Sequence, residues 1–367
     1  MSKQKFILTH PLMGNYGGLL QAYAMYTVLE RLGYQSYMYR YTPKNMDYKP
    51  WNYLWFLLSL IRYSLRLSRN ANGILRKIHI SYKLFKDLRF HHENEYGKLE
   101  QNDSFVVGSD QVWRAIFCRM MKTPEFYFLD FASPAQRSKS IAYAASFGTD
   151  EWEGTPEETK MCGQMLREFK AVSVREHSGV SICQNVFGVK AVQMPDPTML
   201  LTKDDYQGII DKEKTWCPVT PWLSAYILDA NEVNSNLSKD VANALNLQHQ
   251  HLMGHADAPV GRGRHAPTVS QWLRLIRDCD YMITDSFHGS VFAIIFNKPF
   301  VCLGNTYRGA DRFLSLFNTF GLTARLITEP SLEKILETLH TPIDWERVNT
   351  ILASEQKRGY DFLTSNL

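Results

Sequence analysis

Short apolar runs alternate along the chain with stretches whose apolar residues recur every three or four positions. The first pattern is typical of buried strands, and the second of helices that pack on a sheet. Strands are predicted at residues 5–10, 35–41, 104–107, 126–131, 140–144, 171–174, 192–194, 222–228, 249–253, 281–284 and 300–303. Helices are predicted at residues 19–32, 157–169, 236–245, 268–279, 290–296, 313–320, 332–339 and 345–363. This alternation favours an α/β fold with parallel sheets.

The chain is long enough for two domains, and a proline-rich turn marks the expected boundary. Its 367 residues leave room for two ordinary domains with sizeable cores. Two prolines flank Asp196 and fix the backbone there, and the polar residues 201–217 follow. We therefore expect an N-terminal Rossmann-like domain at 1–204, a C-terminal one at 205–340, and a final helix at 341–367 that crosses back to the first domain.

Residues from about 45 to 100 break the alternation and predict a helical insertion in the first domain. The apolar run at 51–61 has eleven residues, too few to span a bilayer, and Arg62, Arg66 and Arg69 follow at helical spacing. The basic amphipathic segment 51–69 fits a helix lying on an anionic membrane surface. An insertion packed on its own domain, or a dimer contact, fits the same residues equally well.

Composition narrows the class of protein. Hydrophobic residues make up 45% of the chain and charged residues 21%, which is typical of a globular protein. A net charge of +4 permits an anionic substrate or a membrane surface and does not argue for nucleic acid. The six cysteines form no C-x-x-C pair and indicate free thiols of a reducing compartment, with no metal site. Since no signal-peptide apolar core precedes the first strand, we expect a cytoplasmic protein, peripheral at the inner face of the membrane if 51–69 binds lipid.

The densest chemical signal lies in a predicted strand-to-helix turn and in the loop after the next strand. The turn holds Asp285, Ser286, His288 and Gly289. In parallel sheets such turns lie at the carboxyl edge of the strands, where ligands bind, and a helix N-terminus there suits an anion. The strand at 300–303 then brings Arg308 and Arg312 to the same edge. A core histidine, helix caps and surface arginines are the alternative interpretation of these residues.

Three other strand ends carry candidate ligand-binding residues. The glycine-bearing loop 11–18 permits close approach of a ligand to the backbone, although it lacks the G-x-G-x-x-G dinucleotide pattern. Asp110 follows the strand at 104–107 and fits either a cleft residue or a helix cap. Arg175 follows the strand at 171–174 and is expected to point into the crevice, with Glu176 as a potential ion-pair partner.

These segments resemble the polysaccharide pyruvyltransferase family. The resemblance rests on DSFHGSVFAIIFNKPF from Asp285, NYGGLLQAYA from Asn15, GSDQVW from Gly108, and the shorter blocks YAASFG, SVRE and DPT. It implies a GT-B-like architecture, in which two Rossmann-like domains face each other across a cleft. It also implies transfer of pyruvate from phosphoenolpyruvate to a sugar.

The resemblance implies roles for individual residues. His288 is expected to be the general acid and base, and Arg175 and Arg308 to bind the donor's carboxylate and phosphate, with Arg312 as the alternative to Arg308. Substrate contacts are also expected from Asn15, Gly17, Gly18, Ser109, Asp110, Asp285, Ser286, Gly289 and Arg312. Phosphoenolpyruvate is a donor substrate here, and no metal or other cofactor is implied.

The implied product is a cyclic pyruvate ketal on a galactose-type hexose of a surface polysaccharide or its lipid-linked precursor, with release of phosphate. Two other functions fit the same architecture. One is a nucleotide-sugar glycosyltransferase of the GT-B type, because nucleotides and phosphoenolpyruvate are both anions that arginines bind. The other is a non-catalytic glycan-binding relative.

Overall fold

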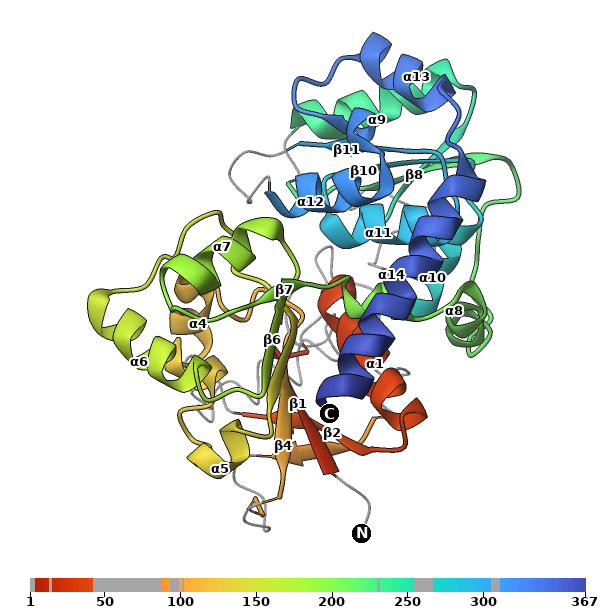
Figure 1. The fold of residues 1–367 in the computed structure, drawn as a ribbon. Helices are drawn as coiled ribbons and strands as arrows, with labels where there is room; N and C mark the ends of the chain where they lie inside the picture. Colours follow the sequence, from red (N-terminus) through yellow and green to blue (C-terminus); the bar gives the residue numbers. More distant parts are fainter. Residues whose placement is uncertain are drawn as a thin grey trace, which may run out of the picture.

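The computed structural model describes residues 4–12, 15–41, 88–92, 99–100, 102–229, 232–253, 267–304 and 311–367. These residues form two parallel sheets, each covered by helices (Figure 1), as the alternating pattern predicted. The proposed membrane-facing segment 51–69 and Arg308 lie outside the described residues, as does most of the expected insertion.

The first sheet has the strand order of a Rossmann fold, with one added edge strand. In spatial order its strands are β3 (Phe90–His92), β2 (Gln35–Arg40), β1 (Gln4–Leu8), β4 (Ser104–Val107), β5 (Ile141–Ala145), β6 (Ala171–Val174) and β7 (Val192–Gln193), all paired in parallel. The order reverses between β1 and β4, which is where such sheets bind ligands. Because β3 pairs with β2, the chain returns to the sheet within the range expected for the insertion.

The second sheet reverses its order between β8 and β10. Its parallel strands are, in spatial order, β12 (Leu326–Ile327), β11 (Phe300–Leu303), β10 (Tyr281–Thr284), β8 (Trp222–Tyr226) and β9 (Gln248–His251). Each sheet therefore has one position of reversed strand order, and parallel sheets bind ligands at the carboxyl edge of such a position.

Helices connect the strands of both sheets. Those of the first part of the chain are α1 (Tyr16–Arg31), α4 (Ala115–Met121), η1 (Glu125–Phe128), α5 (Pro134–Arg137), α6 (Pro156–Leu166), α7 (His177–Asn185) and η2 (Pro197–Leu200). Those of the second part are α8 (Lys203–Ile210), α9 (Glu232–Ala244), α10 (Val269–Arg277), α11 (Phe287–Ile295), α12 (Asp311–Phe320), η4 (Thr323–Arg325), α13 (Leu332–His340) and α14 (Trp345–Asn366).

Two helices begin three residues earlier than the apolar pattern predicted, because side chains cap them. Asn15 accepts a hydrogen bond from the Gly17 amide at 3.1 Å and starts α1 at Tyr16. Ser286 accepts one from the Gly289 amide at 3.3 Å and starts α11 at Phe287. Gly17 and His288 consequently lie in the first turns of helices, where backbone N–H groups have no acceptor within the helix itself.

The strand predicted at 126–131 is wrong. The segment forms the single 3₁₀ turn η1, and Leu129 follows it with a positive φ of 66°. Phe126, Tyr127 and Phe128 are all buried in one core, whereas a strand would send alternate side chains to opposite faces. Phe128 stacks on Trp113 at 5.0 Å between ring centroids. Aromatic packing thus overrides the strand preference of these residues.

The polar linker expected at 201–217 contains the helix α8. Its charged residues lie outward, while Tyr206, Ile209 and Ile210 are buried at the three- and four-residue spacing of one helix face. The Ser270 hydroxyl of α10 donates to the Ile209 carbonyl at 2.9 Å. The helix was not predicted because the stretch is mostly polar, although one apolar face of α8 packs on the second domain.

The last helix, α14, leaves the second domain and lies along the first (Figure 1). Gln356 of α14 donates to the Leu201 carbonyl at 3.2 Å, and Lys5 of β1 donates to the Leu367 carbonyl at 3.5 Å. Gly359 lies so close to the first domain that an added Cβ would stand 2.4 Å from Leu200 Cδ2 and 2.5 Å from Tyr143 Oη.

Gly359→Ala is expected to destabilise the protein by about 1–3 kcal/mol, because the methyl group overpacks this contact. Urea unfolding measures the difference. Ser354→Ala, on the exposed side of the same helix, is the control and is expected to change stability by less than about 0.5 kcal/mol. Equal effects of the two substitutions would contradict the close docking of α14.

Candidate active site

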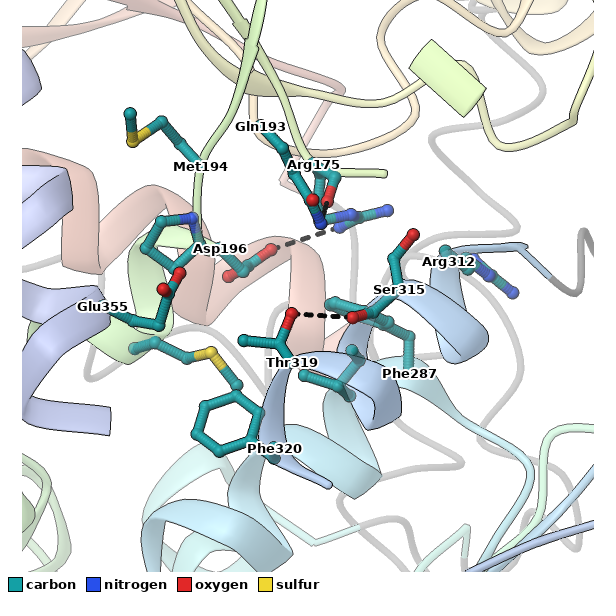
Figure 2. Close-up of a pocket in the computed structure, with 13 residues that line it drawn as sticks. Arg175, Gln193, Met194, Asp196, Phe287, Arg312, Ser315, Thr319, Phe320 and Glu355 are labelled. Carbon is teal, nitrogen blue, oxygen red and sulfur yellow. Dashed lines mark hydrogen bonds and ion pairs between the residues drawn. The ribbon is translucent and has the colours of Figure 1, made fainter. Parts of the chain in front are cut away.

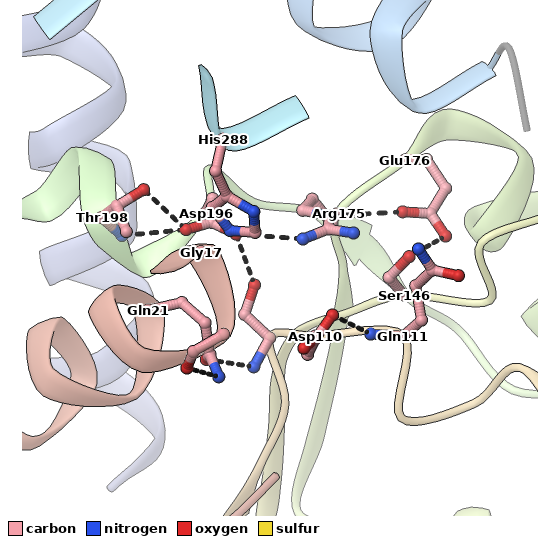
Figure 3. Close-up of polar contacts among 12 residues, drawn as sticks. Gly17, Gln21, Asp110, Gln111, Ser146, Arg175, Glu176, Asp196, Thr198 and His288 are labelled. Carbon is pink, nitrogen blue, oxygen red and sulfur yellow. Dashed lines mark hydrogen bonds and ion pairs between the residues drawn. The ribbon is translucent and has the colours of Figure 1, made fainter. Parts of the chain in front are cut away.

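The carboxyl edges of the two sheets meet where His288 of α11 lies against Gly17 of α1 (Figure 3). A Cβ built on Gly17 would stand 2.1 Å from His288 Nδ1, 2.3 Å from Cγ and 2.7 Å from Cε1. Such distances to three consecutive ring atoms place that Cβ over the ring face, so the imidazole rests flat on the glycine. Only glycine leaves room for this contact.

Asp196 joins four groups at the same point (Figure 3). Its side chain is buried, and Oδ2 accepts hydrogen bonds from Ser109 Oγ at 3.0 Å and Arg175 Nη1 at 3.1 Å. The same oxygen lies 3.5 Å from His288 Nε2. Oδ1 accepts from the Thr198 amide at 3.0 Å and the Thr198 hydroxyl at 2.7 Å. This role of Asp196 was not predicted from the sequence, where the flanking prolines indicate only a rigid turn.

The surroundings of Asp196 keep it ionised. Burial by itself raises the pKa of this carboxyl, but the charge and contact of His288, the charge of Arg175 and the Thr198 amide together hold the pKa well below its ordinary value. Burial likewise acts to raise the pKa of Asp110, and the charges of His10, Arg175 and His288 outweigh it and lower that pKa.

Asp196→Asn is expected to cost about 3–5 kcal/mol of stability at neutral pH, because it leaves buried cations without their anion. A lowered folded-state pKa stabilises the protein above the unfolded value of about 4, and this stabilisation is lost as the pH falls through the folded value. The difference in unfolding free energy between the wild type and Asp196→Asn should therefore become smaller below about pH 4. Urea unfolding between pH 7 and 2.5 measures it. Thr198→Val, the control, removes one hydrogen bond to the same carboxylate and should cost only about 1 kcal/mol at neutral pH.

Arg175 is held by groups from both domains. Besides Asp196, its Nε lies 3.8 Å from Glu176 Oε2, and its Cζ lies 4.4 Å from the Phe287 ring of α11, a cation–π distance. Glu176 Oε1 accepts from the Ser146 hydroxyl at 2.9 Å and from the next two amides of that loop. The guanidinium is therefore fixed beside His288, and its Nη2 has no hydrogen-bond partner among the described residues.

Four of the predicted residues of the first domain gather around this cluster. Asn15 caps α1, and the Gly18 backbone lies against Asp110, whose Oδ2 would stand 3.1 Å from an added Cβ. The Ser109 amide donates to Gln21 Oε1 at 3.0 Å, which ties the loop after β4 to α1. The loops after β1 and β4 thus face the His288 turn, as the resemblance implied.

The other predicted residues of the His288 turn are engaged in structural contacts. Asp285 accepts the Leu228 amide at 2.7 Å and the Asp229 amide at 2.8 Å, which holds the loop after β8. Ser286 caps α11. Gly289 packs so tightly that an added Cβ would stand 2.3 Å from Thr284 Oγ1. Their role in substrate binding stays a prediction.

A half-open pocket lies beside Arg175 and Asp196, between the first domain and helices α12 and α14 (Figure 2). It encloses about 340 Å³ of empty space, part of it open to solvent. Its lining consists of Arg175, Gln193, Met194, Pro195, Asp196, Met199, Phe287, Arg312, Ser315, Leu316, Thr319, Phe320 and Glu355. Arg312 thus reaches the same region as Arg175, from the second domain.

Two further properties concern the described part of the chain. Within these ranges no helix combines the length and the apolar character that crossing a bilayer requires. The same residues gather no group of three or more His, Cys, Asp or Glu side chains that could hold a metal ion.

Solved structures identify the class of fold. UDP-GlcNAc 2-epimerase from Neisseria meningitidis bound to UDP-GlcNAc matches with a TM-score of 0.55 and 10% identity, over 100% of this chain and 99% of that chain. Glycosyltransferase SsfS6 of Streptomyces sp. SF2575, complexed with thymidine diphosphate, has a TM-score of 0.47 and 11% identity, over 99% and 98% of the two chains. An uncharacterized protein from Klebsiella pneumoniae subsp. pneumoniae has a TM-score of 0.49 and 14% identity, over 89% and 93%. The protein has the GT-B-like fold, with two Rossmann-like domains facing each other, and this prediction is confirmed.

Within this class the family is also shown. The family model of polysaccharide pyruvyl transferase matches residues 15–307, and the chain belongs to that family. A search of curated proteins returned no match. The matched range includes Arg175, Asp196 and His288 but ends before Arg308 and Arg312. The assignment of either of these two arginines to the donor therefore rests on position alone.

Proposed function

We propose that this protein transfers pyruvate from phosphoenolpyruvate to a galactose-type hexose of a surface polysaccharide or its lipid-linked precursor. The product is a cyclic pyruvate ketal, and phosphate is released. Family membership supports a pyruvyl transferase. The observation that carries the proposal is the convergence of His288, Arg175 and Asp196 at the junction of the two carboxyl edges.

The reaction needs a proton donor, an anion clamp and exclusion of water. Protonation of the methylene carbon of phosphoenolpyruvate makes C2 electrophilic, and a sugar hydroxyl adds there. Phosphate leaves, and a second hydroxyl of the same sugar closes the ketal. None of these steps calls for a metal or a redox cofactor.

The site residues suit these needs. His288 is almost fully buried, and its Nε2 lies 3.5 Å from the carboxylate of Asp196. Arg175 presents Nη2 for an oxygen of the donor, and a planar guanidinium matches a carboxylate or phosphate. Arg312, which lines the pocket, or Arg308, four positions before it in the sequence, completes the clamp in this proposal. A lipid-linked acceptor would bring the reaction to a membrane surface, and segment 51–69 is our candidate for that contact.

His288→Ala is expected to lower phosphate release from phosphoenolpyruvate by about 10²–10⁴-fold in the presence of acceptor, because it removes the general acid. Colorimetric phosphate assay and mass spectrometry of candidate lipid-linked sugars measure turnover and product. His177→Ala is the matched control, since this exposed histidine lies on the nearby helix α7. Wild-type turnover in His288→Ala contradicts the assignment.

Ligand-induced stabilisation separates the donor classes. At about 100 times its dissociation constant, a ligand adds about 2.7 kcal/mol to stability. We expect phosphoenolpyruvate to raise the melting temperature and nucleotide sugars to leave it unchanged. The reverse result would favour a nucleotide-sugar glycosyltransferase, and stabilisation by glycan alone without turnover would favour a non-catalytic relative.

A further inference from the structure

The two nitrogens of His288 lie in different surroundings. Nε2 lies 3.5 Å from Asp196 Oδ2, is buried, and forms no hydrogen bond with any of the described residues. Nδ1 is not buried in this way, and no described residue forms a hydrogen bond with it. Gly17 covers one face of the ring and does not occupy the in-plane direction of Nδ1.

Asp196 determines which nitrogen carries the proton. An ionised carboxylate only accepts hydrogen bonds, and its lowered pKa keeps Asp196 in that form. A proton on Nε2 is therefore favoured, because a lone pair there would face the negative charge of the carboxylate. In the neutral imidazole one nitrogen donates and the other accepts, so Nδ1 then carries the lone pair.

We propose that Asp196 is a positioning residue, which holds the His288 ring with Nε2–H towards its carboxylate and leaves Nδ1 as the nitrogen that exchanges the proton with the substrate. This inference rests on the proposed function. It places the reacting carbon of the donor on the Nδ1 side of the ring, next to the Gly17 turn.

The proton transfers balance on this nitrogen. Protonated Nδ1 gives its proton to the methylene carbon, and the π electrons of the donor's double bond form the new C–H bond. Neutral Nδ1 then takes the proton of the attacking hydroxyl as the oxygen forms its bond to C2. The C–O bond to phosphate then breaks with its electron pair and leaves an oxocarbenium ion at C2. The second hydroxyl adds there to close the ketal, and its proton passes to the departing phosphate. Throughout these steps the proton on Nε2 stays in place, facing Asp196.

The contacts of Asp196 predict which tautomer His288 adopts in Asp196→Asn. The Thr198 amide is fixed by the backbone and requires an oxygen at the position of Oδ1. We expect the amide NH₂ of the substituted side chain to take the position of Oδ2 and face His288, because there the Ser109 hydroxyl can turn to accept and the Arg175 side chain can shift away. A donor in that place forces Nε2 to accept, so the neutral ring should carry its proton on Nδ1, the opposite tautomer.

The test is ¹⁵N NMR of the histidine-labelled full chain at a pH where the ring is neutral. The chain has 11 histidines, and the spectrum of His288→Gln assigns the signal. We expect Nε2–H in the wild type and Nδ1–H in Asp196→Asn.

For Asp196→Asn we also expect a loss of about 10⁴-fold in kcat for phosphate release, as when a catalytic imidazole is held in the wrong tautomer. KM for phosphoenolpyruvate should change much less than kcat, because the anion clamp remains.

Thr198→Val is the control for a merely structural effect. It removes a hydrogen bond to the same carboxylate and should keep the Nε2–H tautomer, together with at least about a tenth of the activity.

The proposal is overturned if His288 of the wild type carries its proton on Nδ1, or if the tautomer is unchanged in folded Asp196→Asn. If Asp196→Asn does not fold, the wild-type tautomer alone decides. If the wild type shows Nε2–H but releases no phosphate from phosphoenolpyruvate, the role of Asp196 stands and the proposed function fails.

Discussion

Gly17→Ala is expected to remove nearly all activity while leaving the fold intact. The new Cβ would stand 2.1 Å from His288 Nδ1, in the volume that the imidazole occupies. Either the ring leaves Asp196 or the two domains separate at this point. We expect phosphate release to fall by about 10²–10⁴-fold, as for loss of the general acid itself. Because both substitutions disable the same group, Gly17→Ala combined with His288→Ala should lower activity no further than His288→Ala alone.

The stability of Gly17→Ala separates this effect from unfolding. Alanine is the better helix former by about 1 kcal/mol, and overpacking costs about 1–3 kcal/mol, so the net change should be small. Gly208→Ala is the matched control, since an added Cβ on this glycine of α8 would meet none of the described residues within 4 Å beyond its own helix backbone and chain neighbours. It should keep full activity. Equal activities of the two variants would show that His288 does not need its place on Gly17.

Arg175→Met is expected to destabilise the protein by about 3–5 kcal/mol and to stop turnover. Methionine matches the length of the aliphatic stem but leaves Asp196 and Glu176 buried without their cation. It also removes the guanidinium from the Phe287 ring of the other domain. Urea unfolding and phosphate release measure the two effects. Arg175→Lys should recover part of the stability but little of the activity, because an ammonium lacks the planar fork.

Arg358→Met is the control for Arg175→Met. Arg358 pairs with Glu355 on α14, close to the same pocket, but its side chain is 48% exposed. Exposed pairs contribute about 0–1 kcal/mol, so we expect a small loss of stability. If both substitutions lower the free energy of unfolding by the same amount, Arg175 does not stabilise the buried carboxylates Asp196 and Glu176.

Strands buried on both faces were predictable from the sequence. The predictions at 104–107, 171–174, 281–284 and 300–303 coincide with β4, β6, β10 and β11. Each is a short apolar run that ends at a polar or glycine residue, so pattern and burial agree. Residues 126–131 and 203–210 were misjudged, because there tertiary packing decides the conformation.

The candidate site was predictable one residue at a time, but its contacts were not. His288 and Arg175 stand at strand ends, which marks them in the sequence. The role of Asp196 was not predicted, because it depends on contacts with Ser109 and His288, which lie 87 and 92 positions away in the chain. Asp285 looked equally suited to a ligand, but two amides of a loop 56 and 57 positions earlier engage its carboxylate. Only the fold shows which acid faces the histidine.

Helix α14 packs on the first domain but is synthesised only after the second domain. This helix buries Leu200 and Tyr143 of the first domain, yet it follows the whole second domain in sequence. A nascent first domain therefore keeps that apolar surface uncovered while the second domain is being made. A fragment ending at residue 204 should expose it permanently and associate, unless a peptide of residues 341–367 is added in trans.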